Sequence, residues 1–170
     1  MNTPRITIIS SLSDNNVIGD HLVIPWHIKA DLVRFRAVTT GHTIIVGRTT
    51  FELIKCAYEQ RGKPLPDRKS IIITNNSSYR ISEKQCYVVH SMEEAITLGK
   101  KIETDELFIA GGASIYKLGM PFADRLMLTV VHLTVDGDTF FPDYSRFTKV
   151  IEETPQEENG IWYTYRILEP

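Results

Sequence analysis

Hydrophobic positions along the chain form short apolar runs that alternate with stretches of helical spacing. The apolar runs are rich in β-branched residues, as strands buried on both faces are. We expect strands over residues 6–12, 43–46, 70–74, 86–89 and 106–110. Helical spacing predicts helices over residues 29–38, 49–55, 92–101 and 113–118. This alternation predicts an α/β fold built on a mostly parallel sheet.

The pattern changes after Pro121. Strand-like runs then cover residues 125–133, 147–153 and 161–168, and Glu158-Asn159-Gly160 precedes the last of them. Because Asn-Gly between two such runs is a strong hairpin signal, we predict a C-terminal antiparallel hairpin. Farther upstream, Ser91 and Glu94 predict a capping box for the helix 92–101, and Gly99 is expected to weaken its end as a breaker would.

Composition narrows the class of protein. The chain has 170 residues, 42% of them hydrophobic and 24% charged, with a formal net charge of -2. These values are typical of an ordinary globular domain and exclude disordered or fibrous classes. Without a basic surplus, nucleic acid is not an expected partner. No repeat or linker divides the chain, so we expect one domain over residues 1–170, acting as a monomer.

The spacing of cysteines and histidines and the length of the apolar runs indicate the cellular compartment of the protein. Cys56 and Cys86 form no CxxC pair and the five histidines lack metal-ligand spacing, so we expect free thiols and no metal site. No apolar run approaches the ~20 residues of a membrane span. The start, Met1 to Arg5, lacks the pattern of a secretory leader. A cytoplasmic location is therefore expected.

One acid falls on the apolar face of the first predicted helix. The helical period places Asp31 on the same face as four apolar residues, namely Ile28, Leu32, Phe35 and Val38. An unpaired buried carboxylate is costly, so a ligand with two adjacent N–H donors would suit it. The alternative is that Asp31 only favours the positive end of the helix dipole. The apolar loop at residues 23–27, which contains a tryptophan, favours a pocket.

Two strands run into helix starts that suit phosphate groups. These are Gly47-Arg48-Thr49-Thr50 and Gly111-Gly112-Ala113-Ser114. Free N–H groups at a helix start attract anions, arginine binds phosphate through two donors, and glycines allow close backbone approach. Neither segment matches GxGxxG. Alone, each is more often a plain turn or a solvated arginine, but two in one small sheet favour a phosphate-bearing ligand.

Eight short segments carry a more specific signal together than any one does alone. They are Val17-Ile18-Gly19, Ile24-Pro25-Trp26, Ala30-Asp31-Leu32, Val46-Gly47-Arg48-Thr49-Thr50-Phe51, Pro64-Leu65-Pro66-Asp67-Arg68, Ala110-Gly111-Gly112, Leu128-Thr129 and Gly137-Asp138-Thr139. In order and approximate spacing they resemble dihydrofolate reductase over nearly the whole chain. The resemblance implies a single-domain fold with an eight-stranded, mostly parallel sheet, helices on both faces, and folate bound across from NADPH.

The resemblance also implies a dihydrofolate site. Asp31 would bind the exocyclic amine and the adjacent ring nitrogen of the pterin, with Thr129 in support, and Trp26 would hold an ordered water nearby. Arg68 would pair with the glutamate α-carboxylate, unless it is a solvated turn residue. The implied catalytic residues are Asp31, Trp26, Thr129 and Tyr116, and the further substrate-binding residues are Ile9, Ser11, Leu32, Phe35, Ile54, Leu65 and Ala110.

On the cofactor side the resemblance implies NADPH. Arg48, Thr74 and Asn75 would hold the 2′-phosphate, and Thr49, Thr50 and the loop 111–114 would cradle the pyrophosphate, with a cis peptide between Gly111 and Gly112. The segment 17–24 would be a lid over the cofactor. The implied cofactor-binding residues are Ser11, Ile18, Gly19, Gly47, Arg48, Thr49, Thr50, Thr74, Asn75, Gly111, Gly112, Ala113, Ser114, Ile115 and Tyr116.

The chain departs from the usual pattern at several positions. Ile24 and Ala110 stand where other aliphatic side chains are usual, Lys29 where bacterial relatives often have proline, and Ser114 where some have arginine. Residues 55–61 resemble an insertion after the second helix. We expect Ala110 to enlarge the pocket floor and Ser114 to weaken pyrophosphate binding.

The implied activity is the NADPH-dependent reduction of 7,8-dihydrofolate to 5,6,7,8-tetrahydrofolate, with protonation of pterin N5, in one-carbon and thymidylate metabolism. Tyr116 and His27 are rival proton donors to water. Two alternatives stay open. One is a reductase of the same fold acting on another pterin or on a riboflavin-pathway pyrimidine. The other is a folate-binding protein without turnover.

Overall fold

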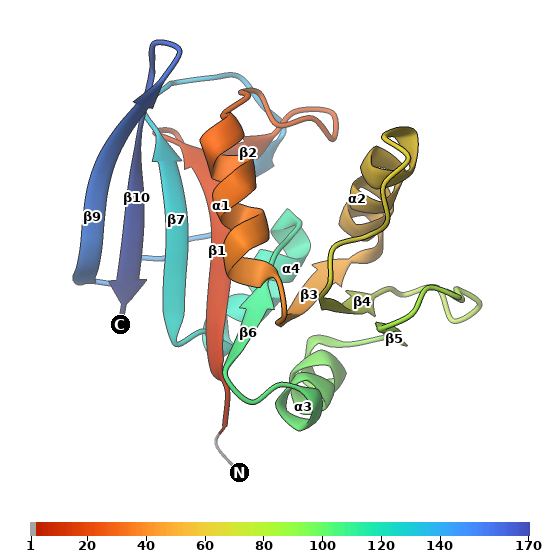
Figure 1. Ribbon diagram of the computed structural model, residues 1–170. Helices are drawn as coiled ribbons and strands as arrows, with labels where there is room; N and C mark the ends of the chain where they lie inside the picture. The colour runs from red at the N-terminus through yellow and green to blue at the C-terminus, as the bar shows by residue number, and fades with distance from the viewer. Residues whose placement is uncertain (1–2) are drawn as a thin grey trace.

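A computed structural model describes residues 3–170, arranged around an eight-stranded sheet (Figure 1). Met1 and Asn2, which the leader prediction includes, lie outside the described residues. The elements in chain order are β1 (Arg5–Ser13), β2 (Val17–Gly19), α1 (Lys29–Thr39), β3 (Thr43–Gly47), α2 (Arg48–Gln60), β4 (Lys69–Ile73), β5 (Cys86–Val89), α3 (Met92–Ile102), β6 (Glu106–Ile109), α4 (Ala113–Gly119), the short 3-10 helix η1 (Met120–Phe122), β7 (Arg125–Val131), β8 (Thr139–Phe140), β9 (Lys149–Glu158) and β10 (Ile161–Glu169).

The strand order of the sheet is β5-β4-β3-β6-β1-β7-β10-β9. The strands from β5 to β7 pair in parallel, whereas β10 pairs antiparallel with both β7 and β9. The predicted fold class is therefore confirmed. A separate two-stranded sheet joins β2 to β8. It was not predicted, because strands of three and two residues are too short to show a period.

Both faces of the sheet are covered, as the continuous apolar strands predict. Along β6, Leu107 and Ile109 belong to one buried cluster, with residues of α3 and α4. Phe108 points into the other cluster, where Phe51 of α2 is buried and Phe35 of α1 packs at the margin. Alternation along a strand thus sends neighbouring side chains to opposite helix layers.

At α3 the N-cap of the predicted capping box, Ser91, is confirmed, but the reciprocal bond of Glu94 goes to His90 and not to Ser91. The role predicted for Gly99 is wrong. The backbone N–H of Glu94 donates to Ser91 Oγ at 3.1 Å, and the Glu94 carboxylate accepts from the N–H of His90 at 2.9 Å. Gly99 is buried inside α3, and a Cβ there would lie 2.5 Å from Leu107 Cδ2. Glycine therefore permits close helix–sheet packing rather than breaking the helix.

The segment predicted to be an insertion after the second helix is part of that helix. α2 continues through residues 55–60, and Arg61 is its C-cap. Lys55 forms an ion pair with Glu83, which lies just before β5. A tertiary contact of this kind, absent from the local sequence pattern, extends the helix beyond the predicted end at residue 55.

The C-terminal hairpin turns where predicted. Glu158 pairs with Ile161, and the two residues between them, Asn159 and Gly160, have φ of 53° and 81°. Such paired positive φ values are the reason for Asn-Gly in a two-residue hairpin turn.

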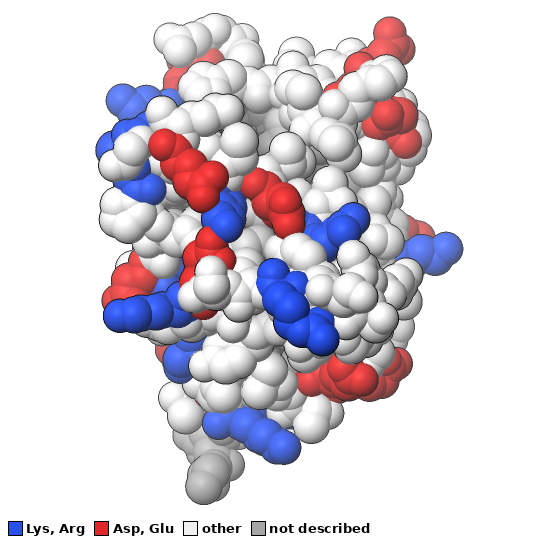
Figure 2. Space-filling model, turned by 90° about the vertical axis from the view of Figure 1, so that its right-hand side faces the viewer, with Lys and Arg blue, Asp and Glu red and all other residues white. Residues whose placement is uncertain are grey.

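Acidic and basic side chains are interspersed over the face that Figure 2 presents. Within residues 3–170, no helix combines the length and apolar character needed to cross a membrane.

Candidate active site

Asp31 lies in the first turn of α1, close to β7. The hydroxyl of Thr129 on β7 donates to Asp31 Oδ1 at 2.5 Å. Burial raises the pKa of the Asp31 carboxyl above its ordinary value, while the Thr129 hydrogen bond and the positive charge of Arg34 oppose that rise. Arg34 stacks on Tyr165, with Cζ 4.2 Å from the ring centroid. The site thus holds a largely desolvated acid with capacity to accept further hydrogen bonds.

Asp31 borders a cavity of about 240 Å³ between α1, α2 and β1. The structure brings together most of the predicted substrate residues here, and Ser10, Ile24, Thr50 and Tyr116 join them. The predicted members of the wall are Ile9, Ser11, Asp31, Leu32, Phe35, Ile54, Ala110 and Thr129. The prediction that the apolar stripe of α1 faces the core is wrong for Leu32, which is 47% exposed. That side chain lines the cavity instead.

Tyr116 lies at the inner end of this cavity with its hydroxyl already bonded. The hydroxyl donates to the carbonyl of Ile9 at 2.8 Å, and burial raises the pKa of Tyr116 to about 12. Because its proton is held by a backbone carbonyl, Tyr116 is better suited to orienting groups than to donating a proton. Trp26 is buried against Ile28 and is not in the cavity wall, so its water-holding role stays a prediction.

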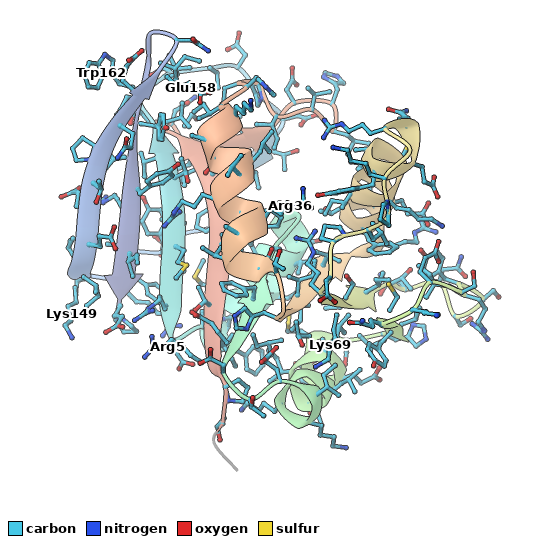
Figure 3. The ribbon with its side chains drawn as sticks, viewed as in Figure 1. Arg5, Arg36, Lys69, Lys149, Glu158 and Trp162 are labelled. Carbon is cyan, nitrogen blue, oxygen red and sulfur yellow. The ribbon has the colours of Figure 1, made fainter. Side chains whose placement is uncertain are left out.

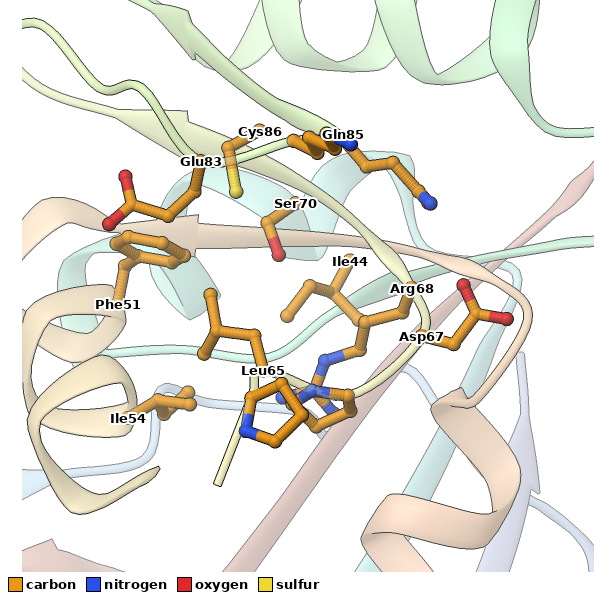
Figure 4. A pocket seen from close by; sticks show the side chains of 13 residues that line it. Ile44, Phe51, Ile54, Leu65, Asp67, Arg68, Ser70, Glu83, Gln85 and Cys86 are labelled. Atoms are coloured by element: carbon orange, nitrogen blue, oxygen red, sulfur yellow. The ribbon is translucent and has the colours of Figure 1, made fainter. Parts of the chain in front are cut away.

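Arg68 and Leu65 line a second cavity of about 390 Å³, which shares Ile54 with the first (Figure 4). Arg68 is only 7% exposed, so the alternative of a solvated turn residue is wrong. Its Nη1 donates to Thr39 Oγ1 at 2.8 Å, and burial lowers its pKa. No carboxylate of residues 3–170 lies within 4.0 Å of its guanidinium. A buried cation without an acid partner suits an anionic ligand group.

A third cavity of about 670 Å³ lies where β3 leads into α2. Most of the predicted cofactor residues line it, and Thr50 lines both this cavity and the one at Asp31, so the two adjoin. The predicted members of its wall are Gly47, Arg48, Thr49, Thr50, Thr74, Asn75, Gly112, Ala113, Ser114 and Ile115, and the other members are Leu22, Ile73, Asn76, Leu118 and Thr139.

The start of α2 and the glycine loop approach each other closely in this cavity. Gly47 is the N-cap of α2 and supplies no side-chain cap, and its N–H donates to the carbonyl of Gly111 at 2.8 Å. The peptide between Gly111 and Gly112 is cis, as predicted. A Cβ on Gly112 would lie 3.3 Å from Thr50 Oγ1, tighter than an ordinary contact. Glycine therefore keeps this corner of the cavity open at the helix start.

Arg48 extends this positive helix start into solvent. The guanidinium carbon lies 5.8 Å from the centroid of the Tyr79 ring, and no carboxylate of the described chain lies within 4.0 Å of it. The neighbouring Thr74 is buried, and its hydroxyl accepts from the N–H of Asn76 at 3.1 Å. This arrangement of an arginine, a hydroxyl-rich helix start and free N–H groups can bind phosphate.

The predicted lid segment 17–24 reaches both the cavity at Asp31 and the large cavity at the start of α2. Asp20 and Val23 exchange backbone hydrogen bonds of 2.8 and 2.9 Å around a tight turn, from which Leu22 lines the large cavity. Ile24 lines the cavity at Asp31. By contrast, the predicted cofactor residues Ile18 and Gly19 lie on β2 and line neither cavity, and Ser11 and Tyr116 line the smaller one.

Sequence reasoning missed several side chains of the site. Arg34 lies three residues after Asp31, and this helical spacing could have identified it. Thr139 belongs to one of the eight matching segments but was given no role. Tyr79 and Ser10 had no local signal, because only the fold brings Tyr79 beside Arg48.

Comparisons with known proteins agree with this geometry. The family profile for dihydrofolate reductase matches residues 5–169. The chain is 39% identical over 139 residues to dihydrofolate reductase type 3 of Salmonella typhimurium, covering 82% of this chain and 79% of that protein. It is 37% identical to dihydrofolate reductase of Bacillus subtilis, covering 96% and 92%.

A solved structure extends the likeness to three dimensions. It is dihydrofolate reductase from Enterococcus faecalis complexed with NADP(H) and RAB-propyl, which superposes with a TM-score of 0.84 at 30% identity and covers 99% of this chain and 97% of its own. Sequence, fold and family profile thus agree over nearly the full length. The chain belongs to the dihydrofolate reductase family.

Proposed function

We propose that this protein catalyses the NADPH-dependent reduction of 7,8-dihydrofolate to 5,6,7,8-tetrahydrofolate. The observation that carries the proposal is the meeting of two cavities at Thr50, one bordered by the half-buried Asp31 and the other by the start of α2. A donor and an acceptor of hydride must lie in contact, and adjoining cavities provide for that. Membership of the family supports the same reaction. The product would serve one-carbon and thymidylate metabolism.

The smaller cavity supplies what a flat, nitrogen-rich heterocycle needs. The Asp31 carboxylate would accept hydrogen bonds from the exocyclic amine and the adjacent ring nitrogen, and the Thr129 hydroxyl keeps Asp31 Oδ1 in place. Leu32 and Phe35 on α1 and Ile54 on α2 offer apolar surfaces on either side. Charge-assisted hydrogen bonds in a largely apolar cavity give orientation as well as affinity.

Arg68 would bind the glutamate α-carboxylate of the substrate. Its guanidinium is buried and has no acid partner among residues 3–170, and its cavity continues from the first one through Ile54. Thr39 and the ring of Phe35 hold the guanidinium from two sides, the latter with its centroid 5.2 Å from Cζ. A preorganised arginine of this kind binds a carboxylate through two donors.

The residues of the large cavity fit NADPH. Arg48, with Thr74 and Asn75 in the same wall, would hold the 2′-phosphate, and Thr49, Thr50 and the uncapped start of α2 would hold the pyrophosphate. NADPH supplies the hydride when bound. The glycine pair keeps the wall thin enough for close approach, as the 3.3 Å distance from Thr50 Oγ1 to a Cβ on Gly112 indicates.

Proton delivery to pterin N5 is the step that the protein must assist, and we assign it to water. Tyr116 keeps its proton on the carbonyl of Ile9. Asp31 would act by orientation and by its negative charge, which favours protonation of a neighbouring nitrogen. Trp26, buried behind Ile28, is proposed to hold the water nearby.

A spectrophotometric assay tests the proposal directly. Purified protein is mixed with NADPH and dihydrofolate, and the loss of NADPH absorbance is followed; steady turnover is expected. The same assay with other pterins and with a riboflavin-pathway pyrimidine discriminates a reductase of different specificity. Tight folate binding without NADPH consumption would instead mean a non-catalytic folate-binding protein.

A further inference from the structure

The start of α1 is capped by a side chain from the far end of the sequence. The N-cap residue Ile28 has no capping group. Instead, the N–H of Lys29 donates to Glu158 Oε2 at 2.6 Å, and the N–H of Ala30 donates to Glu158 Oε1 at 3.1 Å. Glu158 is the last residue of β9, and Figure 3 shows it beside the upper end of α1. One carboxylate thus satisfies two N–H groups that have no partner within the helix.

The residue after this capped pair is Asp31. Thr39 in its last turn is the one fully buried residue of α1, and Phe35 and Val38 pack only partly buried against a core cluster. The other residues of α1 are all half-buried or exposed, and its inner side borders the cavity. Its first turn is therefore held by Ile28, which packs with Trp26, and by the two hydrogen bonds to Glu158.

Asp31 is consequently fixed from two strands of the same sheet. Thr129 of β7 bonds its carboxylate, and Thr129 pairs across the sheet with Tyr165 of β10. The hairpin partner of β10 is β9, whose last residue is Glu158. A shift of the hairpin tip would therefore move the backbone of Asp31 relative to Thr129.

We propose that Glu158 is a positioning residue for Asp31, which fixes the first turn of α1 so that the carboxylate meets both the Thr129 hydroxyl and the ligand. The proposal rests on the function proposed above for Asp31. Glu158 borders neither of the two adjoining cavities, so it acts through the helix start and not by contact with substrate.

The test compares Glu158→Ala and Glu158→Gln with a matched control, Glu152→Gln. Glu152 lies on the same strand, is exposed, and accepts a hydrogen bond only from the Thr154 hydroxyl within the described residues. Two properties are measured: turnover of dihydrofolate as a function of pH, and the titration of the Asp31 carboxyl by carbon NMR in the ligand-free protein. The polar groups facing Asp31, namely Arg34 of α1, Thr129 of β7, Tyr116 of α4 and Tyr165 of β10, are unchanged in all three variants.

We expect Glu158→Ala to lower kcat about tenfold, because a small displacement of a group that orients the substrate reduces the rate strongly. The Asp31 titration should move toward lower pH, because a loosened first turn admits water to a carboxyl whose pKa burial raises. Glu158→Gln keeps one acceptor oxygen and should fall between parent and alanine variant. Glu152→Gln should match the parent in both measurements.

Three results would overturn the positioning role. The first is a folded Glu158→Ala protein with the turnover and Asp31 titration of the parent. The second is a loss of unfolding free energy with neither pH curve displaced, which would mean that Glu158 only stabilises the fold. The third is an equal change in Glu152→Gln, which would mean a general charge effect. If the parent does not turn over dihydrofolate, the proposed function fails, while the NMR titration still tests Glu158.

Discussion

Replacing Asp31 with asparagine should remove most of the activity while leaving the cavity intact. Asparagine has nearly the same shape, and its amide oxygen can still accept from the Thr129 hydroxyl, which bonds Oδ1 at 2.5 Å in the parent. Its amide nitrogen, however, is a donor and would face the donors of the pterin. The exchange thus loses at least one charge-assisted hydrogen bond, worth roughly 1.5–3 kcal/mol.

That free energy sets the expected rate. At about 1.4 kcal/mol per tenfold change, this loss corresponds to a rate roughly 10- to 150-fold below that of the parent. Because assistance to protonation of N5 is lost as well, we expect a decrease of about 10²-fold or more. NADPH absorbance loss with dihydrofolate measures it. Asp136→Asn, at an exposed position, is the control. A rate for Asp31→Asn within about threefold of the parent would exclude Asp31 from the catalytic site.

The same variant should be more stable than the parent at neutral pH when no ligand is bound. Burial raises the pKa of Asp31 in the folded protein, so the folded state holds this proton more tightly than the unfolded chain does. Ionisation is then unfavourable to folding, by ~1.4 kcal/mol for each unit of pKa difference. The penalty is absent below the unfolded pKa, grows as pH rises, and is complete above the folded pKa.

Urea unfolding at a series of pH values checks this sign. The free energy of unfolding of Asp31→Asn should exceed that of the parent at pH 7, and the difference should shrink as pH falls toward the ordinary aspartate value of 3.8. A difference that does not change with pH, or one that favours the parent at neutral pH, would refute the interpretation of Asp31 as a desolvated acid.

Three further substitutions test other parts of the structure. Arg48→Ala should raise the KM for NADPH much more than the KM for NADH, and equal effects on both would place the 2′-phosphate elsewhere. Arg68→Met should raise the KM for dihydrofolate about tenfold or more, which is the equivalent of one charge-assisted hydrogen bond. It should scarcely change the KM for dihydropteroate, which lacks the glutamate. A similar rise for both substrates would contradict the role of Arg68 in carboxylate binding. Gly99→Ala should lower the free energy of unfolding by roughly 1–3 kcal/mol in urea titration, because its Cβ would overlap the fully buried Leu107, at 2.5 Å from Cδ2. Unchanged or increased stability would mean that Leu107 can move aside and that the helix propensity of alanine prevails.

How far the sequence predicts this fold depends on how local the signal is. The six parallel strands and the Asn159-Gly160 turn follow from runs of apolar residues and from one dipeptide, so their positions are correct within a few residues. The end of α2 and the role of Gly99 were predicted wrongly, because a contact with a distant residue decides each of them. Those contacts are Lys55 with Glu83 and Gly99 with Leu107.

The candidate site shows the same division. Asp31, Arg48 and the glycine pair stand out in the sequence because each conflicts with its local surroundings, as an acid on an apolar stripe does. Their partners are ordinary residues that only strand register brings into range. Thr129 reaches Asp31 from 98 positions away, and Glu158 reaches the N–H of Ala30 from 128.

The apolar stripe of α1 led to residues that do line the cavity at Asp31, although the reason for the prediction was partly wrong. An apolar stripe normally marks a face buried in the core. In α1, Ile28 at the start is buried, but Leu32 is 47% exposed and lines the cavity together with Phe35. The stripe thus continues from the core onto the wall of a binding site, where a ligand must complete the burial that the protein leaves unfinished. A helix with one fully buried residue is weakly positioned by core packing, and the carboxylate of Glu158, from a distant hairpin, adds two hydrogen bonds at its first turn.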